Sequence, residues 1–391
     1  MSTEIELRYG MNPHQKEARV YMADGSPLPI EVLNGSPGYI NVLDALNSWQ
    51  LVRDLRQALE LPAAASFKHV SPAGAAIGLP LPDELRRAYF VGDLELSPLA
   101  AAYARARGAD RVSSFGDWAA FSDVVDLPAA ELLRREVSDG VIAPGYEPRA
   151  LELLRKKKKG GYRILQVDPA YDAPAIEKRE VFGVTLAQQH NDYMPRPGDL
   201  TDIVTRNKDL TAAARQDMIV ALLALKYTQS NSVCFAIDGQ VIGMGAGQQS
   251  RIHCTRLAAA KADAWFLRQN SRLLDLPFRE EVGRTARDNA IDQYLQEQLP
   301  APEEALWREN FTAVPQRMPA QVKRYWLSEQ GGVTMGSDAF FPFRDSIDRA
   351  AQSAVRYVVQ PGGSIRDEAV VAACDEYGMV MVMTGTRLFH H

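Results

Sequence analysis

A hairpin that runs into a glycine-rich loop constrains the fold of this chain more than any other feature. Residues 233–237 and 240–244 are short apolar runs on either side of Asp238-Gly239. An Asp-Gly pair favours a two-residue hairpin turn, because both residues tolerate positive φ. The second run enters Gly243-Met-Gly-Ala-Gly247, and a helical pattern follows over 250–270. The sequence therefore predicts a β-hairpin joined to a helix by a glycine loop.

The rest of the chain alternates short apolar runs with longer helical patterns, which predicts a layered α/β fold. Strands are expected over 63–67, 162–167, 357–359 and 379–383, and helices over 40–59, 83–107, 129–136, 148–159, 210–226 and 366–376. The polar, proline-interrupted stretch 274–330 is predicted to be a mostly helical insertion or peripheral layer.

Bulk composition narrows the class of protein. A chain of 391 residues favours two or three packed units, and a net charge of -5 argues against a general nucleic-acid binder. No apolar run approaches the length of about 18 residues expected of a membrane span, and residues 1–8 lack a signal-peptide pattern. Cys234, Cys254 and Cys374 are too widely spaced for a Cys-x-x-Cys zinc site. We expect a cytoplasmic protein, in which the lysines at 156–159 form a solvated helix end.

Two junctions of strand, glycine loop and helix, at 243–256 and 361–368, are candidate anion sites, because a helix start presents unpaired N–H groups. Arg251 in a first helical turn is unfavourable, so a nearby anion would explain it. A tight turn that needs glycine is an equally good interpretation of either junction. The spacing of the first junction is G-x-G-x-G, and no P-loop motif occurs, which argues against NAD or ATP as a cofactor.

Three polar clusters are candidates for chemistry. Lys68-His69 follows an expected strand and could place a charge stabiliser beside a base, although a solvated lysine and a structural histidine are the commoner outcome. The segment from Arg8 to His14 is either a surface turn or a ligand contact. The tail 387–391 follows an apolar strand directly, so we expect it to be held against the fold although chain ends often fray.

Motifs spread in order along the whole chain carry a family resemblance. They are Leu7-Arg-Tyr-Gly-Met-Asn-Pro-His-Gln15, Gly38-Tyr-Ile-Asn41, Ser66-Phe-Lys-His-Val-Ser-Pro-Ala-Gly74, Arg111-Val-Ser-Ser-Phe-Gly-Asp117, Glu136-Val-Ser-Asp-Gly140, Tyr227-Thr-Gln-Ser-Asn-Ser-Val-Cys234, Gly245-Ala-Gly-Gln-Gln-Ser-Arg-Ile-His-Cys-Thr-Arg256, Ser337-Asp-Ala-Phe-Phe-Pro-Phe-Arg-Asp345, Gln360-Pro-Gly-Gly-Ser-Ile-Arg-Asp367 and the tail 385–391. Together they resemble the AICAR transformylase portion of the bifunctional purine enzyme that also carries IMP cyclohydrolase.

The resemblance implies roles for individual residues. His69 matches the catalytic base, Lys68 its charge-stabilising partner, and His391 a terminal histidine near that pair. Other residues match positions that surround the AICAR nucleotide: Arg8, Tyr9, Asn41, Gly116, Asp139, Asn231, Arg251, Phe341 and Arg387. Of these, Arg8 and Arg387 are expected to contact its phosphate. Positions on the folate side are Ile252, Asp345, Ser364 and Ile365.

The implied reaction transfers the formyl group of 10-formyltetrahydrofolate to the 5-amino group of AICAR. A base removes the amine proton during attack, and Lys68 and the Asn231 amide are the candidate donors to the tetrahedral oxyanion. The resemblance also implies a homodimer whose active sites draw on both subunits, and K+ near the terminal histidine with unassigned ligands. Zinc, nucleic acid and membranes are not expected as partners.

The family fold is a duplicated three-layer α/β fold similar to cytidine deaminase, with subdomains expected over 1–195 and 196–391 and with 274–330 packing on the first. A zinc deaminase is one alternative, but it needs H-x-E and P-C-x-x-C motifs, and Cys254 and Cys374 lack such partners. A catalytically silent regulatory homologue that binds nucleotide or folate is another. The retained Lys68 and His69 favour an enzyme.

The family motif that normally follows an N-terminal cyclohydrolase domain begins here at Leu7. We therefore expect this chain not to cyclise the formylated product. The alternative is that the sequence is a truncated form of a longer chain.

Overall fold

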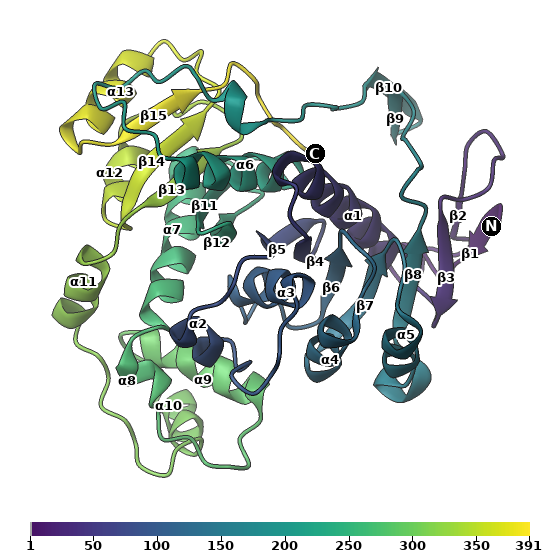
Figure 1. Ribbon diagram of the computed structural model, residues 1–391, viewed down its shortest axis with the longest axis horizontal. Helices are drawn as coiled ribbons and strands as arrows, with labels where there is room; N and C mark the ends of the chain where they lie inside the picture. The colour runs from purple at the N-terminus through teal and green to yellow at the C-terminus, as the bar shows by residue number, and fades with distance from the viewer. Residues whose placement is uncertain (1) are drawn as a thin grey trace.

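A computed structural model describes residues 2–391 and is built around one 11-stranded sheet with helices on both faces (Figure 1). The strand order is β15-β14-β13-β11-β12-β5-β4-β6-β7-β8-β3. The first half contains β1 (Glu4–Glu6), β2 (Arg19–Tyr21), β3 (Ile30–Asn34), α1 (Tyr39–Leu59), β4 (Ala63–Lys68), β5 (Ser71–Ile77), α2 (Asp83–Ala88), α3 (Pro98–Gly108), β6 (Asp117–Phe121), α4 (Leu127–Arg135), β7 (Ser138–Ala143), α5 (Pro148–Arg155), η1 (Lys157–Gly160), β8 (Arg163–Val167), β9 (Ile176–Val181) and β10 (Val184–Gln189). The second half contains η2 (Pro197–Asp199), α6 (Ala212–Lys226), β11 (Val233–Ile237), β12 (Gln240–Gly245), α7 (Arg251–Leu267), α8 (Ser271–Leu274), α9 (Arg284–Leu295), α10 (Ala301–Arg308), α11 (Ala320–Ser328), β13 (Val333–Ser337), α12 (Asp345–Ala351), β14 (Val355–Gln360), α13 (Asp367–Glu376) and β15 (Val380–Met383).

The two halves of the sheet repeat one order of elements. In the first half, apart from α2 and η1, the order is α1-β4-β5-α3-β6-α4-β7-α5-β8, in which an antiparallel hairpin is followed by three strands that run parallel to one another. In the second half the order is α6-β11-β12-α7-β13-α12-β14-α13-β15, with α8 to α11 inserted after α7, and the strand pairing is the same. The halves meet where β5 and β12 pair antiparallel at Gln240 and Ala76. The α/β prediction is confirmed, whereas the likeness to cytidine deaminase and the boundary near residue 195 stay predictions.

The hydrophobic core lies on both faces of the sheet. Trp49 of α1 and Leu222 of α6 belong to the cluster on one face, and Tyr103 of α3 and Trp265 of α7 belong to the cluster on the other. Full burial of such large side chains contributes roughly 1.5–3 kcal/mol each, which is enough to fix the helices against the sheet. The helical and sheet layers thereby set the positions of the loops at the sheet edges.

The helical region 274–330 forms a third apolar cluster around Trp307, which is 1% exposed. Phe90 from the first half packs against this cluster. The buried guanidinium of Arg111 donates to Asp288 of α9 at 2.9 Å, and Arg87 pairs with Asp275 at 2.6 Å. This region therefore contacts the first half of the chain as well as α7.

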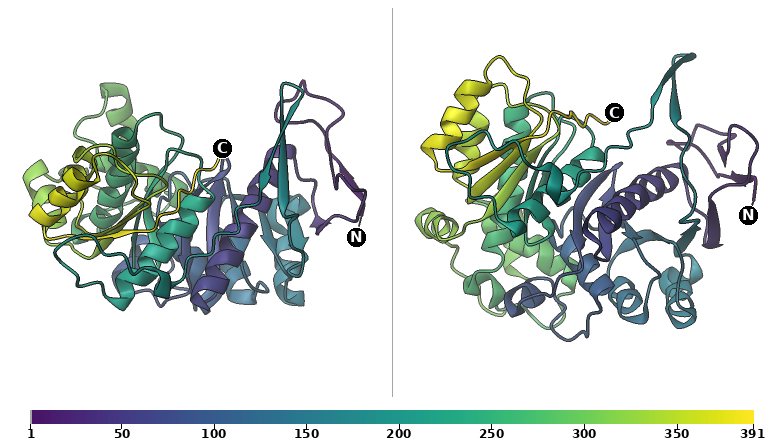
Figure 2. Two further views of the ribbon diagram at one scale, coloured as in Figure 1. Left: turned by 90° about the horizontal axis from the view of Figure 1, so that it is seen from above. Right: turned by 45° about the horizontal axis from the view of Figure 1, so that its top comes forward.

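Some element boundaries differ from those expected. The predicted helix over 83–107 is two helices, because Ser97 caps α3 by accepting a hydrogen bond from Ala100 N and Pro98 occupies its first turn. The helix predicted to reach residue 159 ends at Arg155, and Lys158 has a φ of 52°. The hairpin β9–β10 was not predicted; it is exposed along its length and stands away from the body (Figure 2). None of the helices within residues 2–391 is long and apolar enough to cross a membrane.

Candidate functional site

The loops that carry most of the predicted site residues gather at one edge of the central sheet. The β4–β5 turn lies there beside the starts of β6 and β7, because β4 runs antiparallel to β6. The antiparallel junction of β5 with β12 brings the end of β12 to the same edge. A hydrogen bond from Gln229 N to Ser71 Oγ, 3.3 Å long, joins the two halves there. Residues far apart in the sequence therefore share one surface.

Lys68 and His69 belong to the tight turn between β4 and β5, which the sequence had indicated only as a polar loop. Both central residues, His69 and Val70, have positive φ, at 53° and 56°. Lys68 Nζ donates to the carbonyl oxygen of Phe115 at 2.7 Å. Lys68 and His69 line a pocket of about 410 Å³ with Gln229 and other residues of the second half. The predicted catalytic pair therefore faces an open pocket between the halves.

Asp44 lies beneath this turn and was not identified from the sequence. Its side chain projects from α1, is 6% exposed, and accepts a hydrogen bond from Val70 N at 2.7 Å. Burial raises the pKa of the Asp44 carboxyl, while the Val70 N–H and nearby His69 act in the opposite direction. The carboxyl therefore lies in contact with the backbone that carries the candidate base.

Asn231 is held by a buried ion pair. Arg251, which is 6% exposed, donates to Asn231 Oδ1 at 2.9 Å, to Ser232 O at 2.8 Å and to Asp338 Oδ1 at 2.5 Å. Because a guanidinium only donates hydrogen bonds, the Asn231 amide presents its oxygen to Arg251 and leaves its NH2 group free to donate elsewhere. The anion inferred beside Arg251 from the sequence is thus, in this structure, the carboxylate of Asp338.

The second glycine-rich junction also contacts a carboxylate of the protein. The backbone N–H groups of Gly363 and Ser364 donate to Asp367 Oδ2 at 2.7 and 3.1 Å. The two junctions that were candidate anion sites therefore contact carboxylates of the protein, Asp338 and Asp367.

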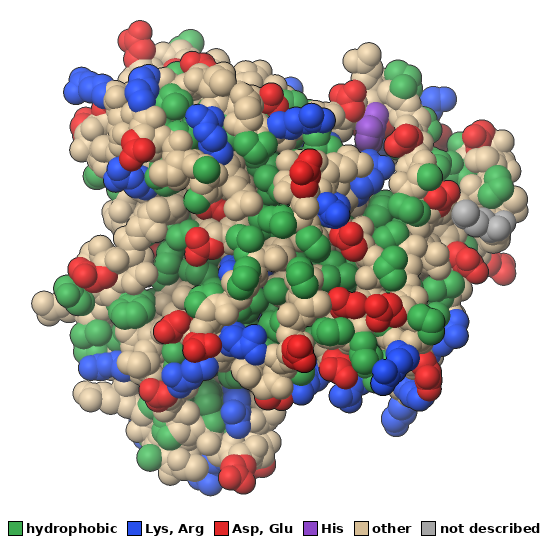
Figure 3. Space-filling view, viewed as in Figure 1, with side chains coloured by type: hydrophobic (Ala, Val, Ile, Leu, Met, Phe, Trp, Pro, Cys, Tyr) green, Lys and Arg blue, Asp and Glu red, His purple; other side chains and the backbone are tan. Residues whose placement is uncertain are grey.

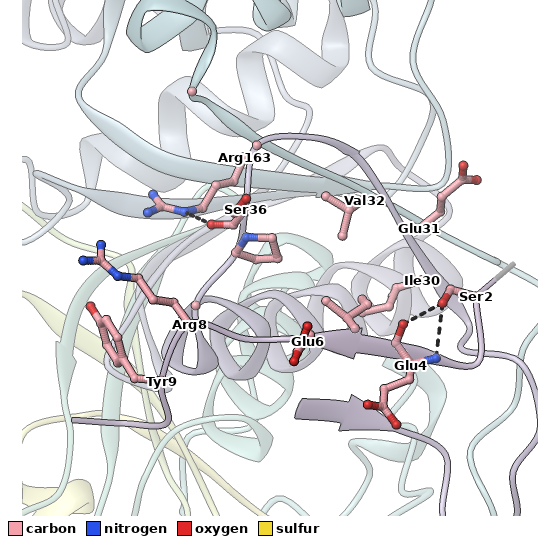
Figure 4. Close-up of a pocket in the computed structure, with 15 residues that line it drawn as sticks. Ser2, Glu4, Glu6, Arg8, Tyr9, Ile30, Glu31, Val32, Ser36 and Arg163 are labelled. Atoms are coloured by element: carbon pink, nitrogen blue, oxygen red, sulfur yellow. Dashed lines mark hydrogen bonds between the residues drawn. The ribbon is translucent and has the colours of Figure 1, made fainter. Parts of the chain in front are cut away.

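Arg8 and Tyr9 line a larger pocket, of about 1040 Å³, near β3 and the start of α1 (Figure 4). Arg163 lines the same pocket, with its Nε donating to Ser36 O at 3.0 Å. In Figure 4 the guanidinium groups of Arg8 and Arg163 and the hydroxyl of Tyr9 lie on the same side of the pocket. This pocket can present two cationic groups and a hydroxyl to an anionic ligand. Sequence reasoning did not identify Arg163.

Asn41, Gly116 and Asp139 lie on backbone that borders this edge. Asn41 Oδ1 accepts a hydrogen bond from Gly38 N at 2.9 Å and so caps the start of α1. Gly116 has a φ of 75° and its N–H donates to Val137 O at 2.8 Å. Asp139, at the start of β7, pairs with Lys158 Nζ at 2.7 Å. Their contacts with a nucleotide stay predictions.

The lysine run differs in part from the solvated helix end that was predicted. Lys and Arg side chains gather over α5 on the face shown in Figure 3, and Lys156 forms an exposed pair with Glu152. Lys157 is instead partly buried, and its Nζ donates to Glu136 O. Burial, with nearby Lys158 and Arg107, lowers the pKa of Lys157 to about 8.

The C-terminal tail is held against the fold, as predicted. Leu388 is 1% exposed and its N–H donates to Asp338 O at 2.8 Å, and His390 N donates to Ser230 Oγ at 3.1 Å. Burial lowers the pKa of His390. Arg387 and His391 line a pocket of about 700 Å³ together with the β9–β10 hairpin. In the single chain, Arg387 and His391 line a different pocket from those lined by Arg8 and by Lys68.

The other predicted ligand contacts have mixed environments. Phe341 is fully buried and its N–H donates to Gln360 Oε1 at 3.2 Å, so its side chain packs in the core in this structure. The folate-side residues lie in or just after the loops that follow β12, β13 and β14: Ile252, Asp345, Ser364 and Ile365. Ile365 is fully exposed. Their roles stay predictions.

Comparison with known proteins identifies the family. Residues 1–261 match the family described as AICARFT/IMPCHase bienzyme. The chain belongs to this family. It is 31% identical over 392 residues to the bifunctional purine biosynthesis protein PurH of Xanthomonas campestris pv. campestris (strain 8004), covering 99% of this chain and 58% of that protein. It is also 31% identical over 396 residues to PurH of Magnetococcus marinus, covering 98% of this chain and 59% of that protein.

The part of the chain that matches the AICARFT/IMPCHase family includes residues from both halves of the sheet at the candidate site. The family match contains the β4–β5 turn with Lys68 and His69, and also Asn231 and Arg251. The chain spans less than two thirds of the length of these curated relatives. Within residues 2–391, no cluster of three or more His, Cys, Asp or Glu side chains that could hold a metal ion is found.

Proposed function

We propose that this chain transfers the formyl group of 10-formyltetrahydrofolate to the 5-amino group of AICAR, giving formyl-AICAR and tetrahydrofolate in purine biosynthesis. The observation that carries the proposal is the turn at Lys68 and His69, which faces an open pocket shared by both halves of the chain. Membership of the AICARFT/IMPCHase family, and the purine biosynthesis proteins among its relatives, support the same reaction.

His69 is the proposed general base. As the AICAR amine attacks the formyl carbon, His69 accepts the amine proton, directly or through the neighbouring carboxamide. Lys68, whose ammonium is oriented by Phe115 O, and the NH2 group of Asn231 donate hydrogen bonds to the oxyanion. When the C–N bond to tetrahydrofolate breaks, N10 leaves with a proton supplied by Lys68 or His69.

Substrate contacts follow the family resemblance. We propose that Arg8 and Arg387 bind the AICAR phosphate and that His391 approaches the catalytic pair. These residues line separate pockets in one chain, which supports a homodimer in which a second copy completes each site. K+ near His391 is part of the same proposal, with its ligands unassigned.

The first test is a chromatographic product assay of the purified chain with AICAR and 10-formyltetrahydrofolate. Accumulation of formyl-AICAR supports the proposal, and absence of product from folded protein overturns it in favour of a regulatory binding protein. Inosinate among the products would reveal cyclohydrolase activity as well. The Lys68→Ala variant should lose activity on the order of 10²-fold, as expected for loss of an oxyanion donor. Lys159→Ala, at an exposed lysine, serves as the matched control.

A further inference from the structure

The turn that carries His69 has an unfavourable backbone. His69 and Val70 both adopt the left-handed region, at φ values of 53° and 56°. Two-residue hairpin turns of this kind favour Asn-Gly or Asp-Gly, and a β-branched residue such as Val70 is strongly disfavoured there. Backbone held in such a region requires support from the surrounding structure, and it is concentrated at functional sites.

Asp44 supplies direct support to this turn. It is the sixth residue of α1, it is 6% exposed, and its Oδ1 accepts a hydrogen bond from Val70 N at 2.7 Å. A charge-assisted hydrogen bond of this length to the disfavoured residue stabilises its conformation. The other charged groups around this edge are Lys68 beside His69, Asp139 at the start of β7, and Lys261 lining the pocket from α7.

The second half of the chain repeats the same contact at its own hairpin. Asp217 is the sixth residue of α6, and its carboxyl accepts from Gly239 N at 2.7 Å and from Asp238 N at 3.2 Å. That turn is Asp-Gly, whose residues adopt positive φ readily. It lies at the opposite edge of the sheet, beside Ile77. The two halves therefore share the carboxylate support, but only the first retains a disfavoured turn, and that turn carries His69.

We propose that Asp44 is a positioning residue that fixes the His69-Val70 turn and thereby aims the His69 imidazole into the reaction pocket. The inference rests on the proposed formyl transfer for its catalytic consequence. Asp44 acts through the backbone and is not expected to touch either substrate. Loss of its carboxyl therefore affects the rate of the chemical step more than the binding of AICAR.

The experiment compares Asp44→Ala, Asp44→Asn, and Asp44→Ala combined with Val70→Gly in the full chain. Asparagine keeps an oxygen that can accept from Val70 N, and glycine adopts positive φ without support. Asp217→Asn at the opposite turn is the matched control. The measurements are kcat, the KM for AICAR, and hydrogen exchange of the Val70 amide in protein labelled with ¹⁵N-valine.

We expect Asp44→Ala to lose tenfold or more in kcat with a KM for AICAR changed less than threefold, and to lose about tenfold in Val70 amide protection. Asp44→Asn should keep most of both, and the glycine combination should recover kcat. Asp217→Asn should leave kcat unchanged. If Asp44→Ala fails to fold, the same inference is tested by Asp44→Asn and the glycine combination.

Wild-type kcat from Asp44→Ala with reduced Val70 protection would overturn the positioning role and leave the proposed reaction intact. So would a glycine combination that folds but recovers no activity. If the wild-type chain forms no formyl-AICAR, the proposed function fails, and the exchange measurement then decides separately whether Asp44 holds the turn. Unchanged protection in Asp44→Ala would overturn that contact as well.

Discussion

Truncating Asp338 to alanine should destabilise the protein strongly, because this carboxylate holds several separate segments together. It is fully buried and accepts hydrogen bonds from Ser230 Oγ at 2.6 Å, Ser232 N at 2.9 Å and Arg251 at 2.5 Å. Without it, the guanidinium of Arg251 remains buried without its carboxylate. Removal of one member of a buried ion pair typically costs about 3–5 kcal/mol, and the lost neutral hydrogen bonds add about 1 kcal/mol each.

The assay is urea denaturation of the wild type, Asp338→Ala, Arg251→Met and the double variant. Since replacing both ions avoids an unpaired buried charge, the double variant should be more stable than the sum of the single changes predicts, by about 2 kcal/mol or more. Activity should not return in the double variant, because Asn231 loses the donor that orients its amide. A loss below about 1 kcal/mol in Asp338→Ala, or strict additivity, would refute the reasoning.

Three further outcomes are expected. Burial raises the pKa of the Asp217 carboxyl to about 7. Its contribution to stability is therefore present below the unfolded pKa near 3.8 and is lost as the pH rises through 7. Urea denaturation at pH 5 and at pH 8 should show that Asp217→Asn gains stability relative to the wild type as the pH is raised. Trp307→Ala should cost about 3–5 kcal/mol in the same assay while leaving kcat of the remaining folded protein unchanged, because the side chain fills the peripheral cluster. Leu388→Ala should cost about 2–4 kcal/mol and increase proteolysis of the tail; a tail equally resistant to carboxypeptidase would contradict its docking.

Local sequence signals predicted the elements whose structure is decided locally. The helix expected over 40–59 is α1, and the Asp238-Gly239 hairpin forms as predicted, with both residues at positive φ. The turn at His69-Val70 was expected only as a loop, because neither residue is typical of a two-residue hairpin. Its conformation depends on Asp44, a residue 26 positions away in the sequence, and no local pattern reveals that contact.

In the candidate site, too, local sequence signals indicated which residues matter but not how they are oriented. Lys68, His69 and Asn231 could be chosen by family resemblance, but their orientation comes from contacts distant in sequence. Arg251 and Asp338 are 87 positions apart and meet because β13 pairs with β11 beside the start of α7. An anion near Arg251 was one of two interpretations of this junction, and the sequence could not distinguish a bound ligand from a carboxylate of the protein. Whether Arg251 meets a ligand or Asp338 depends on the order of the strands in the sheet, which hydrophobic periodicity in the sequence does not reveal.

The repeated architecture gives a physical reason why the catalytic pair is proposed on the first hairpin and not on the second. The two hairpins lie on related elements, and each receives a carboxylate from the sixth residue of the preceding helix. At the second hairpin, Asp238-Gly239 forms the turn at little conformational cost and needs no function to explain it. At the first, a histidine and a valine occupy positions where glycine would be more stable, so stability alone does not account for them. Retaining His69 there makes sense if its side chain is needed at the pocket, and the cost is then reduced by Asp44.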